Sequence, residues 1–118
     1  MSKVIKLKDH DRIYGTSYHN ATVRASMAEL ENKFGVKAKR CVGDGKTKYE
    51  MLLEVDGTVT SIYDWKEEGR VTKNTVLELH IGTMTEGGSK KVVDIFKNDY
   101  GLDAKYTSWE ELKKKWGI

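Results

Sequence analysis

Residues 49–65 read YEMLLEVDGTVTSIYDW, and this stretch decides the fold. Apolar residues occupy every second position from Tyr49 to Val55, with glutamates at two of the positions between them. A period of two predicts a β-strand with one buried face. Asp56-Gly57 is a strong signal for a tight turn, and the β-branched and aromatic residues of 58–65 predict a returning strand. The stretch therefore predicts an antiparallel hairpin.

A third strand is predicted over 75–81, where apolar and polar residues alternate again. Leu77, Leu79 and Ile81 share one face of this strand, whereas His80 lies on the other, less apolar face. Three strands joined by short links form an antiparallel meander. We expect Leu53 to be buried in it together with the three apolar residues of the third strand.

A helix is predicted over 26–34, immediately before this sheet. Ser26 and Glu29 have the spacing of a capping box, and apolar residues follow at helical spacing. Gly35 supplies the left-handed residue that ends such a helix.

Two further helices are predicted after the sheet. An apolar stripe among lysines indicates one over 89–98. A second capping box at Ser108 starts a short one, with Trp109, Leu112 and Trp116 facing inward. The expected fold is a single α+β domain over residues 1–118, in which two or three helices pack against an antiparallel sheet of three to five strands.

Composition excludes several classes of protein. The 118 residues are 38% hydrophobic and 33% charged, and no apolar run approaches the length of a membrane-spanning helix. A single cysteine and three scattered histidines argue against a disulfide framework, a zinc site or another cofactor. A net charge of +3 permits an anionic partner, but a polynucleotide binder is usually more basic. With no basic and apolar leader, we expect a cytoplasmic protein and no membrane partner.

The sequence contains no catalytic constellation that we can identify, so we expect a binding protein and not an enzyme. Cys41 next to Arg40 has the setting of an activated thiol, although a small buried apolar residue is the simpler interpretation.

Aromatic residues at the end of the second strand give the better signal. Tyr63 and Trp65 lie on one face by alternation, and Lys66 follows them. Aromatic faces stack on nucleobases, and a lysine meets a phosphate. The alternative is that both rings belong to the core.

The next strand ends in His80-Ile81-Gly82-Thr83, which offers an imidazole, a hydroxyl and a glycine that lets a ligand approach the backbone. Lys90 and Lys91 lie in the first turn of the helix expected over 89–98. The helix dipole disfavours cations there unless an anion such as phosphate is bound. Two solvated lysines are the alternative explanation.

A third group of polar residues lies in an early turn, where Thr16, Ser17 and Tyr18 offer two hydroxyls and a ring. Turns are rich in such residues, so this group indicates a binding site only in combination with the two groups described above.

In order, several short motifs resemble a widespread family of small tailed-phage proteins over about residues 13–97. They are Gly15-Thr16-Ser17, Lys33-Phe34-Gly35, Asp56-Gly57-Thr58-Val59, Ile62-Tyr63-Asp64-Trp65-Lys66 and His80-Ile81-Gly82. The sequence departs from that pattern in two places. Leu79 and Thr83 stand where the family has Trp and a second Gly, and Tyr18-His19-Asn20 replaces Leu-Gln-Gly.

The resemblance implies a phage anti-CBASS sponge, which sequesters cyclic dinucleotides such as 3′3′-cGAMP without degrading them. A homodimer is expected, because a two-fold interface suits a pseudo-symmetric ligand. The site is expected where the ends of the two predicted strands 58–65 and 75–81 meet the early turn, and a second subunit is expected to bring one end across. The alternative is a host-takeover factor that binds a host protein or nucleic acid.

Overall fold

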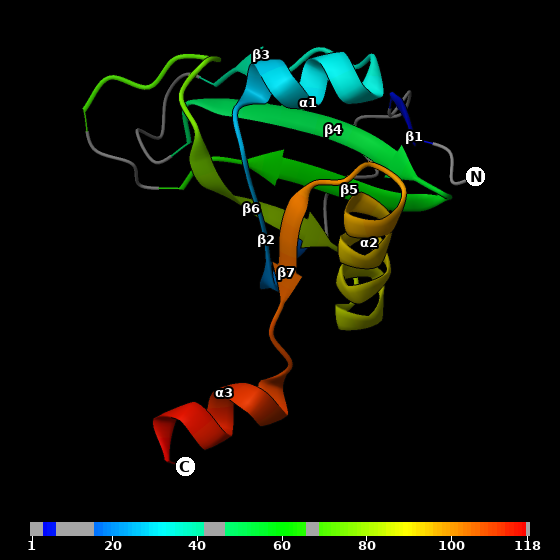
Figure 1. Cartoon of the computed structure of the whole chain (residues 1–118), viewed down its shortest axis with the longest axis vertical. Helices are drawn as coiled ribbons and strands as arrows, with labels where there is room; N and C mark the ends of the chain where they lie inside the picture. Colours follow the sequence, from blue (N-terminus) through cyan, green and yellow to red (C-terminus); the bar gives the residue numbers. More distant parts are fainter. Residues whose placement is uncertain (1–3, 7–15, 42–46, 66–68, 118) are drawn as a thin grey trace.

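The structure, a computed structural model, describes residues 4–6, 16–41, 47–65 and 69–117 (Figure 1). Its strands are β1 (Val4–Lys6), β2 (Ser17–Ala25), β3 (Lys39–Arg40), β4 (Tyr49–Val55), β5 (Thr58–Tyr63), β6 (Leu77–Thr83) and β7 (Asp103–Tyr106). Its helices are α1 (Met27–Phe34), α2 (Glu86–Asn98) and α3 (Trp109–Trp116).

The seven strands form one antiparallel sheet in the order β1-β4-β5-β6-β2-β7, with β3 paired to β4. The α+β class and the β4-β5-β6 meander are confirmed. Asp56 and Gly57 both have positive φ, as the predicted two-residue hairpin turn requires. The prediction of three to five strands is wrong, because β3 and β7 have only two and four residues, too few for a period of two to be recognised.

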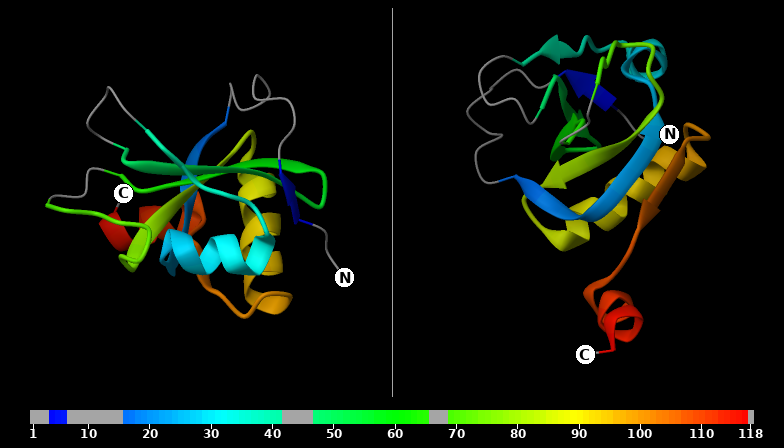
Figure 2. Two further views of the ribbon diagram at one scale, coloured as in Figure 1. Left: turned by 90° about the horizontal axis from the view of Figure 1, so that it is seen from above. Right: turned by 90° about the vertical axis from the view of Figure 1, so that its left-hand side faces the viewer.

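Helices α1 and α2 lie on the same side of the sheet, which curls around them (Figure 2). The main core fills this helix-covered face, and the rings of Phe34 on α1 and Phe96 on α2 meet there with centroids 5.0 Å apart. Leu53, Leu79 and Ile81 are buried as expected, but Leu77 is only partly buried. Burial of this apolar surface is the main force that holds the layers together.

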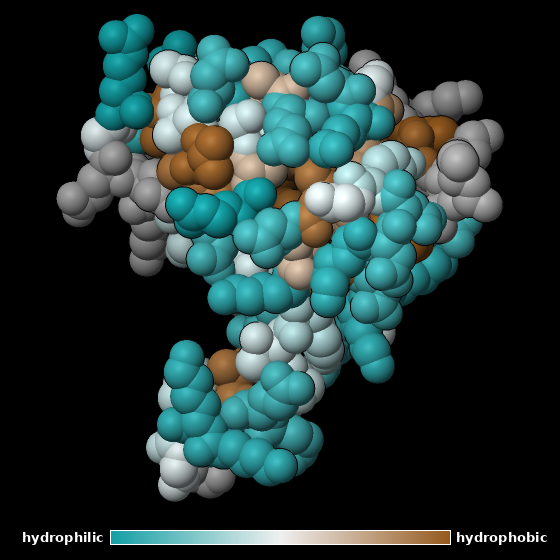
Figure 3. Space-filling model, viewed as in Figure 1, coloured by the Kyte–Doolittle hydropathy of each residue, from teal (hydrophilic) through white to brown (hydrophobic). Residues whose placement is uncertain are grey.

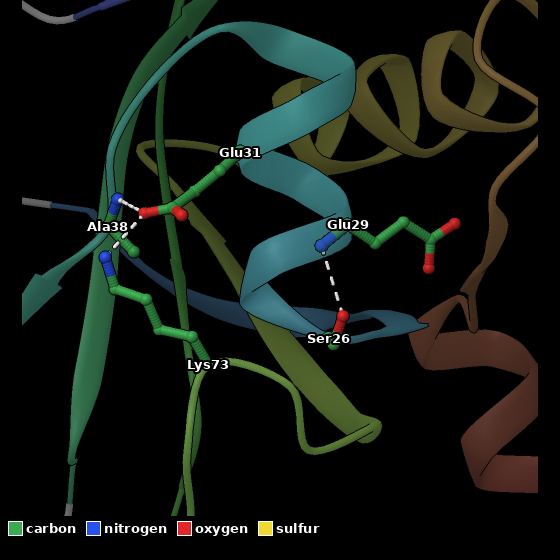
Figure 4. Close-up of polar contacts among 5 residues, drawn as sticks. All are labelled: Ser26, Glu29, Glu31, Ala38 and Lys73. Carbon is green, nitrogen blue, oxygen red and sulfur yellow. Dashed lines mark hydrogen bonds and ion pairs between the residues drawn. The ribbon is translucent and has the colours of Figure 1, made fainter.

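The local signals of α1 are confirmed at both ends. The hydroxyl of Ser26 accepts a hydrogen bond from the backbone N–H of Glu29 at 3.1 Å, and Gly35 ends the helix with φ of 68°. The carboxylate of Glu29 points away from Ser26 (Figure 4), so only half of a capping box forms.

Helix α3 hangs from the end of β7 as a mostly hydrophilic lobe joined by a narrow neck (Figure 3). None of its residues is buried, and the side chains of Trp109 and Trp116 are 47% and 57% exposed. The prediction that its aromatic residues face the core is therefore wrong. The chain after β7 carries α3 away from the sheet (Figure 1), and the two indole rings of α3 lie edge to face with centroids 6.1 Å apart.

Within the part of the chain described, no helix has the length and apolar character needed to cross a membrane.

Candidate ligand-binding site

The face of the sheet opposite α1 and α2 carries the candidate site. Tyr63 on β5 is the register partner of His80 on β6, and His80 is in turn the partner of Thr22 on β2. These three side chains form one row across the sheet. Because Ile62, Ile81 and Val23 point into the core, alternation directs this row to the other face.

Four aromatic side chains gather here, and we call Tyr18, Tyr63, Trp65 and His80 the ring cluster. The Tyr18 and His80 rings are stacked with centroids 4.1 Å apart and planes 16° from parallel. The Trp65 ring lies 6.2 Å from that of His80 at 24°. Tyr63 stands nearly perpendicular to both Trp65 and His80, at 6.1 and 5.6 Å. Tyr18, His80 and Trp65 thus form a row of three near-parallel rings, and the ring of Tyr63 packs edge-on against His80 and Trp65.

The ring cluster forms within one chain, whereas a second subunit was expected to bring one of the two strand ends to the site. The third strand runs from Leu77 to Thr83 and not over 75–81, so His80 lies near its middle and not at its end. Tyr63 at the end of β5 is therefore directly opposite His80. A second subunit is not needed to bring these two residues together.

A β-bulge in β2 determines the position of the Tyr18 ring. The register with β6 shifts between Tyr18 and Ala21, and Asn20 has a positive φ of 63°. Tyr18 comes to lie opposite Gly82, which has no side chain. A Cβ at Gly82 would be 2.6 Å from the hydroxyl of Ser61, so a side chain at this position would force the Ser61 hydroxyl to move.

The environment of the two tyrosines keeps their hydroxyls protonated. Burial raises the pKa of Tyr18, and the negative charge of Glu78 adds to the effect. Burial likewise raises the pKa of Tyr63, with smaller contributions from Tyr18 and Glu50. Both hydroxyls therefore remain hydrogen-bond donors at neutral pH.

Thr16 lies immediately before β2, and Ser17 and Tyr18 are the first residues of that strand, so the expectation that they lie in a turn is wrong. The hydroxyl of Ser17 is hydrogen-bonded to Nε2 of His19 at 3.1 Å. Both expected polar residues are therefore next to the ring cluster in sequence, at the edge of the bulge.

Thr83 does not join the ring cluster. Its side chain is fully buried, and its hydroxyl contacts the Ser89 hydroxyl and the Thr85 carbonyl, each at 2.6 Å. These hydrogen bonds connect the end of β6 to the start of α2 on the helix-covered face of the sheet.

The two lysines of α2 also lie elsewhere. The helix begins at Glu86 with Thr85 as its N-cap, so Lys90 and Lys91 are in its second turn and not its first. The dipole argument for a phosphate beside them is therefore wrong. Lys91 donates a hydrogen bond to the carbonyl of Asp56 at 2.9 Å and thereby holds the hairpin turn. Lys66 lies outside the described residues.

Sequence reasoning missed a charged hollow of about 90 Å³ that continues the row past His80. It is lined by Thr22, Arg24, Glu78, Asp103 and Lys105. Alternation within β2 could have indicated it, because buried residues at 21, 23 and 25 direct those at 22 and 24 to the ring-cluster face. Its two cations are matched by two carboxylates, and Lys105 lies 3.9 Å from Glu78.

Neither known protein families, nor curated proteins, nor solved structures give a match to this chain. Among the described residues, no group of His, Cys, Asp and Glu could hold a metal ion.

Proposed function

We propose that this protein binds a cyclic dinucleotide such as 3′3′-cGAMP and sequesters it unmodified, as a phage anti-CBASS sponge in the host cytoplasm. The ring cluster carries the proposal. It collects in one place four of the residues that the sequence singled out for ligand binding, from strands that are far apart in the chain.

The row of rings suits a ligand with two bases. Its two ends are Tyr18 and Trp65, whose side chains are 41% and 39% exposed, with His80 between them. Each end offers a ring face to one base, and such stacking contributes about 1–3 kcal/mol per base. Large rings left exposed beside one another on a protein surface are typical of a binding site.

The ring cluster itself supplies hydrogen-bond donors for the phosphates. The raised pKa of Tyr18 and Tyr63 keeps their hydroxyls protonated, and Thr16 and Ser17 immediately precede Tyr18 in the chain. Arg24 supplies a cation at the charged hollow. The carboxylates of Glu78 and Asp103 in the same hollow offset the positive charge of Arg24, so in this proposal the rings provide most of the affinity.

Binding without chemistry is part of the proposal. Among the described residues, Ser17 and His19 come nearest to a nucleophile and base, but the pair is exposed and formed by residues two apart on one strand. Acyl or phosphoryl transfer needs a base that is itself oriented and a preformed site for the developing charge. We therefore propose stoichiometric capture at the ring cluster. The cluster forms within one chain, so this capture does not depend on the homodimer that we also propose.

Calorimetry with 3′3′-cGAMP tests this function, followed by heat denaturation and mass spectrometry of the released nucleotide. We expect saturable binding and full recovery of the intact cyclic compound. Recovery of a linear product would identify an enzyme. Absence of binding, together with salt-sensitive binding of polynucleotide or a stable complex with a host protein, would favour the takeover factor instead.

A further inference from the structure

A second hollow, of about 350 Å³, lies at the other face of the sheet from the ring cluster. Its lining is Arg40, Cys41, Lys48, Tyr49, Arg70, Val71 and Thr72, and we call it the basic hollow. Tyr49 precedes Glu50, the register partner of Tyr63, so alternation directs Tyr49 away from the ring cluster. The two candidate sites are thus on opposite sides of β4 and β5.

The walls of the basic hollow are fixed by buried and charge-assisted hydrogen bonds. The carboxylate of Asp64, 1% exposed, accepts bonds from the backbone N–H groups of Lys48 and Tyr49 at 2.9 and 2.7 Å. Nζ of Lys48 donates to the carbonyl of Gly69 at 2.5 Å, which ties the segment containing Arg70 to β4. Hydrogen bonds to charged groups are the stronger kind, so this wall is preorganised.

Glu31 fixes the same segment from its other end. One oxygen of its carboxylate accepts hydrogen bonds from the N–H of Ala38 and from Nζ of Lys73, both at 2.8 Å (Figure 4). The chain that leads into β3 is thereby joined to the loop that leads into β6. Glu31 therefore holds in place both segments of the basic hollow, the one that contains Arg40 and the one that contains Arg70.

Among the described residues, the lining of the basic hollow carries charge of one sign. Three of its seven described lining residues are cations and none of the seven is acidic. Asp64 is nearby, but its oxygens accept from the backbone N–H groups of β4. Arg40 and Arg70 are exposed and form no ion pair within the described ranges. A preorganised hollow that presents these two arginines attracts an anion.

We propose that the basic hollow is a second binding site, for a phosphate monoester of mononucleotide size. The two guanidinium groups of Arg40 and Arg70 match the two charges of a monoester, and guanidinium binds phosphate oxygens in pairs. Tyr49 and Val71 give an apolar surface for the remainder of the ligand. The volume lies at the lower end of the range for ligand pockets, about 300–1,000 Å³.

The chain's single cysteine provides the test, because Cys41 lines the basic hollow. The rate of its alkylation by iodoacetamide is measured with AMP, inorganic phosphate, adenosine or 3′3′-cGAMP present. We expect AMP to slow the reaction at lower concentration than phosphate, and adenosine and 3′3′-cGAMP to have no effect. A calorimetric titration with AMP measures the same binding independently of the thiol.

Substitutions test whether AMP binds at the basic hollow. Arg70→Gln and Arg40→Gln should each raise the AMP concentration for half protection about tenfold, as expected for loss of a hydrogen bond to a charged group. Lys97→Gln removes an exposed cation from the last turn of α2 and should change nothing. Tyr18→Ala should leave AMP binding intact while weakening 3′3′-cGAMP, so this proposal and the proposed function fail separately.

Four outcomes would overturn the proposal: no AMP binding by calorimetry at millimolar concentration, equal protection by adenosine, protection by 3′3′-cGAMP, or unchanged AMP binding in both arginine variants. Thermal melting of each variant shows that it is folded.

Discussion

The ring of Tyr18 on β2 lies flat against the imidazole of His80 on β6, with centroids 4.1 Å apart and planes 16° from parallel. The two residues are not register partners, since Tyr18 faces Gly82 and His80 faces Thr22. Contact between them depends on the bulge at His19 and Asn20, which shifts the start of β2 along β6. The candidate site is therefore sensitive to the register of two neighbouring strands.

Trp65→Ala should weaken 3′3′-cGAMP binding about ten- to a hundredfold, because it removes the exposed ring at one end of the row. Trp65→Phe should retain most of the affinity, since stacking needs only a ring face. Calorimetry measures both.

The matched control for that substitution is Trp109→Ala, which removes a comparably exposed indole from α3. Equal losses in the two alanine variants would show that the ring cluster is not the site.

Gly82→Ala should lower the free energy of unfolding by about 1–3 kcal/mol, because its Cβ would be 2.6 Å from the hydroxyl of Ser61. In a Ser61→Ala background the same change should cost less, since the clashing oxygen is gone. Urea denaturation of the four proteins gives the coupling. The control Gly87→Ala meets only Thr85 Oγ1, at 4.0 Å, and should stabilise α2. A full cost in the Ser61→Ala background would contradict the packing argument.

Glu31→Gln should lower stability at neutral pH by about 1–2 kcal/mol. Burial alone would raise the pKa of Glu31, but hydrogen bonds from Lys73 and the Ala38 N–H, with the charges of Lys73 and Lys37, bring it below 4.5. A depressed folded-state pKa gives stability that is complete above pH 4.5 and is lost as pH falls through the folded value. The difference between the two proteins should therefore shrink in acid, as followed by urea denaturation against pH.

The control for this prediction is Glu29→Gln on the same helix, whose exposed carboxylate points away from these partners (Figure 4). Its effect on the free energy of unfolding at neutral pH should be small.

Tyr106 should resist ionisation. Burial, together with a hydrogen bond from its hydroxyl to Glu86 and the charges of Glu86 and Glu111, raises its pKa to about 12. Its contribution to stability is complete below pH 10 and is lost as pH rises towards 12. Spectrophotometric titration, with Tyr106→Phe subtracted to isolate this residue, measures the pKa. Glu86→Gln should lower it, and an unchanged value would contradict the contact.

Helix α3 should mediate self-association. An isolated helix of eight residues is marginal in water, and its two exposed indoles are the residue type most often central to an interface. Sedimentation should show a dimer, and the double substitution Trp109→Ala, Trp116→Ala should yield a monomer that still binds one equivalent of AMP. A monomeric parent protein would refute this.

Local patterns alone determined much of this fold. The alternation in 49–65 and its Asp56-Gly57 turn predicted the hairpin, and the helix that ends at Gly35 followed from its caps. These features are predictable because they depend on residues close in the chain, through side-chain period, turn conformation and capping hydrogen bonds. The same alternation made Tyr63, Trp65 and His80 candidates, whereas Tyr18 was a candidate only as part of an expected polar turn.

Only the tertiary structure decided which strands are neighbours and in what register. Backbone hydrogen bonds are alike for any pair of strands, so the placement of β2 between β6 and β7 follows from burial summed over the whole core. That placement brings Tyr18 onto His80, and burial of Thr83 against Ser89 likewise sets the end of β6. The basic hollow also joins segments that no local pattern links, because the buried carboxylate of Asp64 and the bridging carboxylate of Glu31 each satisfy donors distant in sequence.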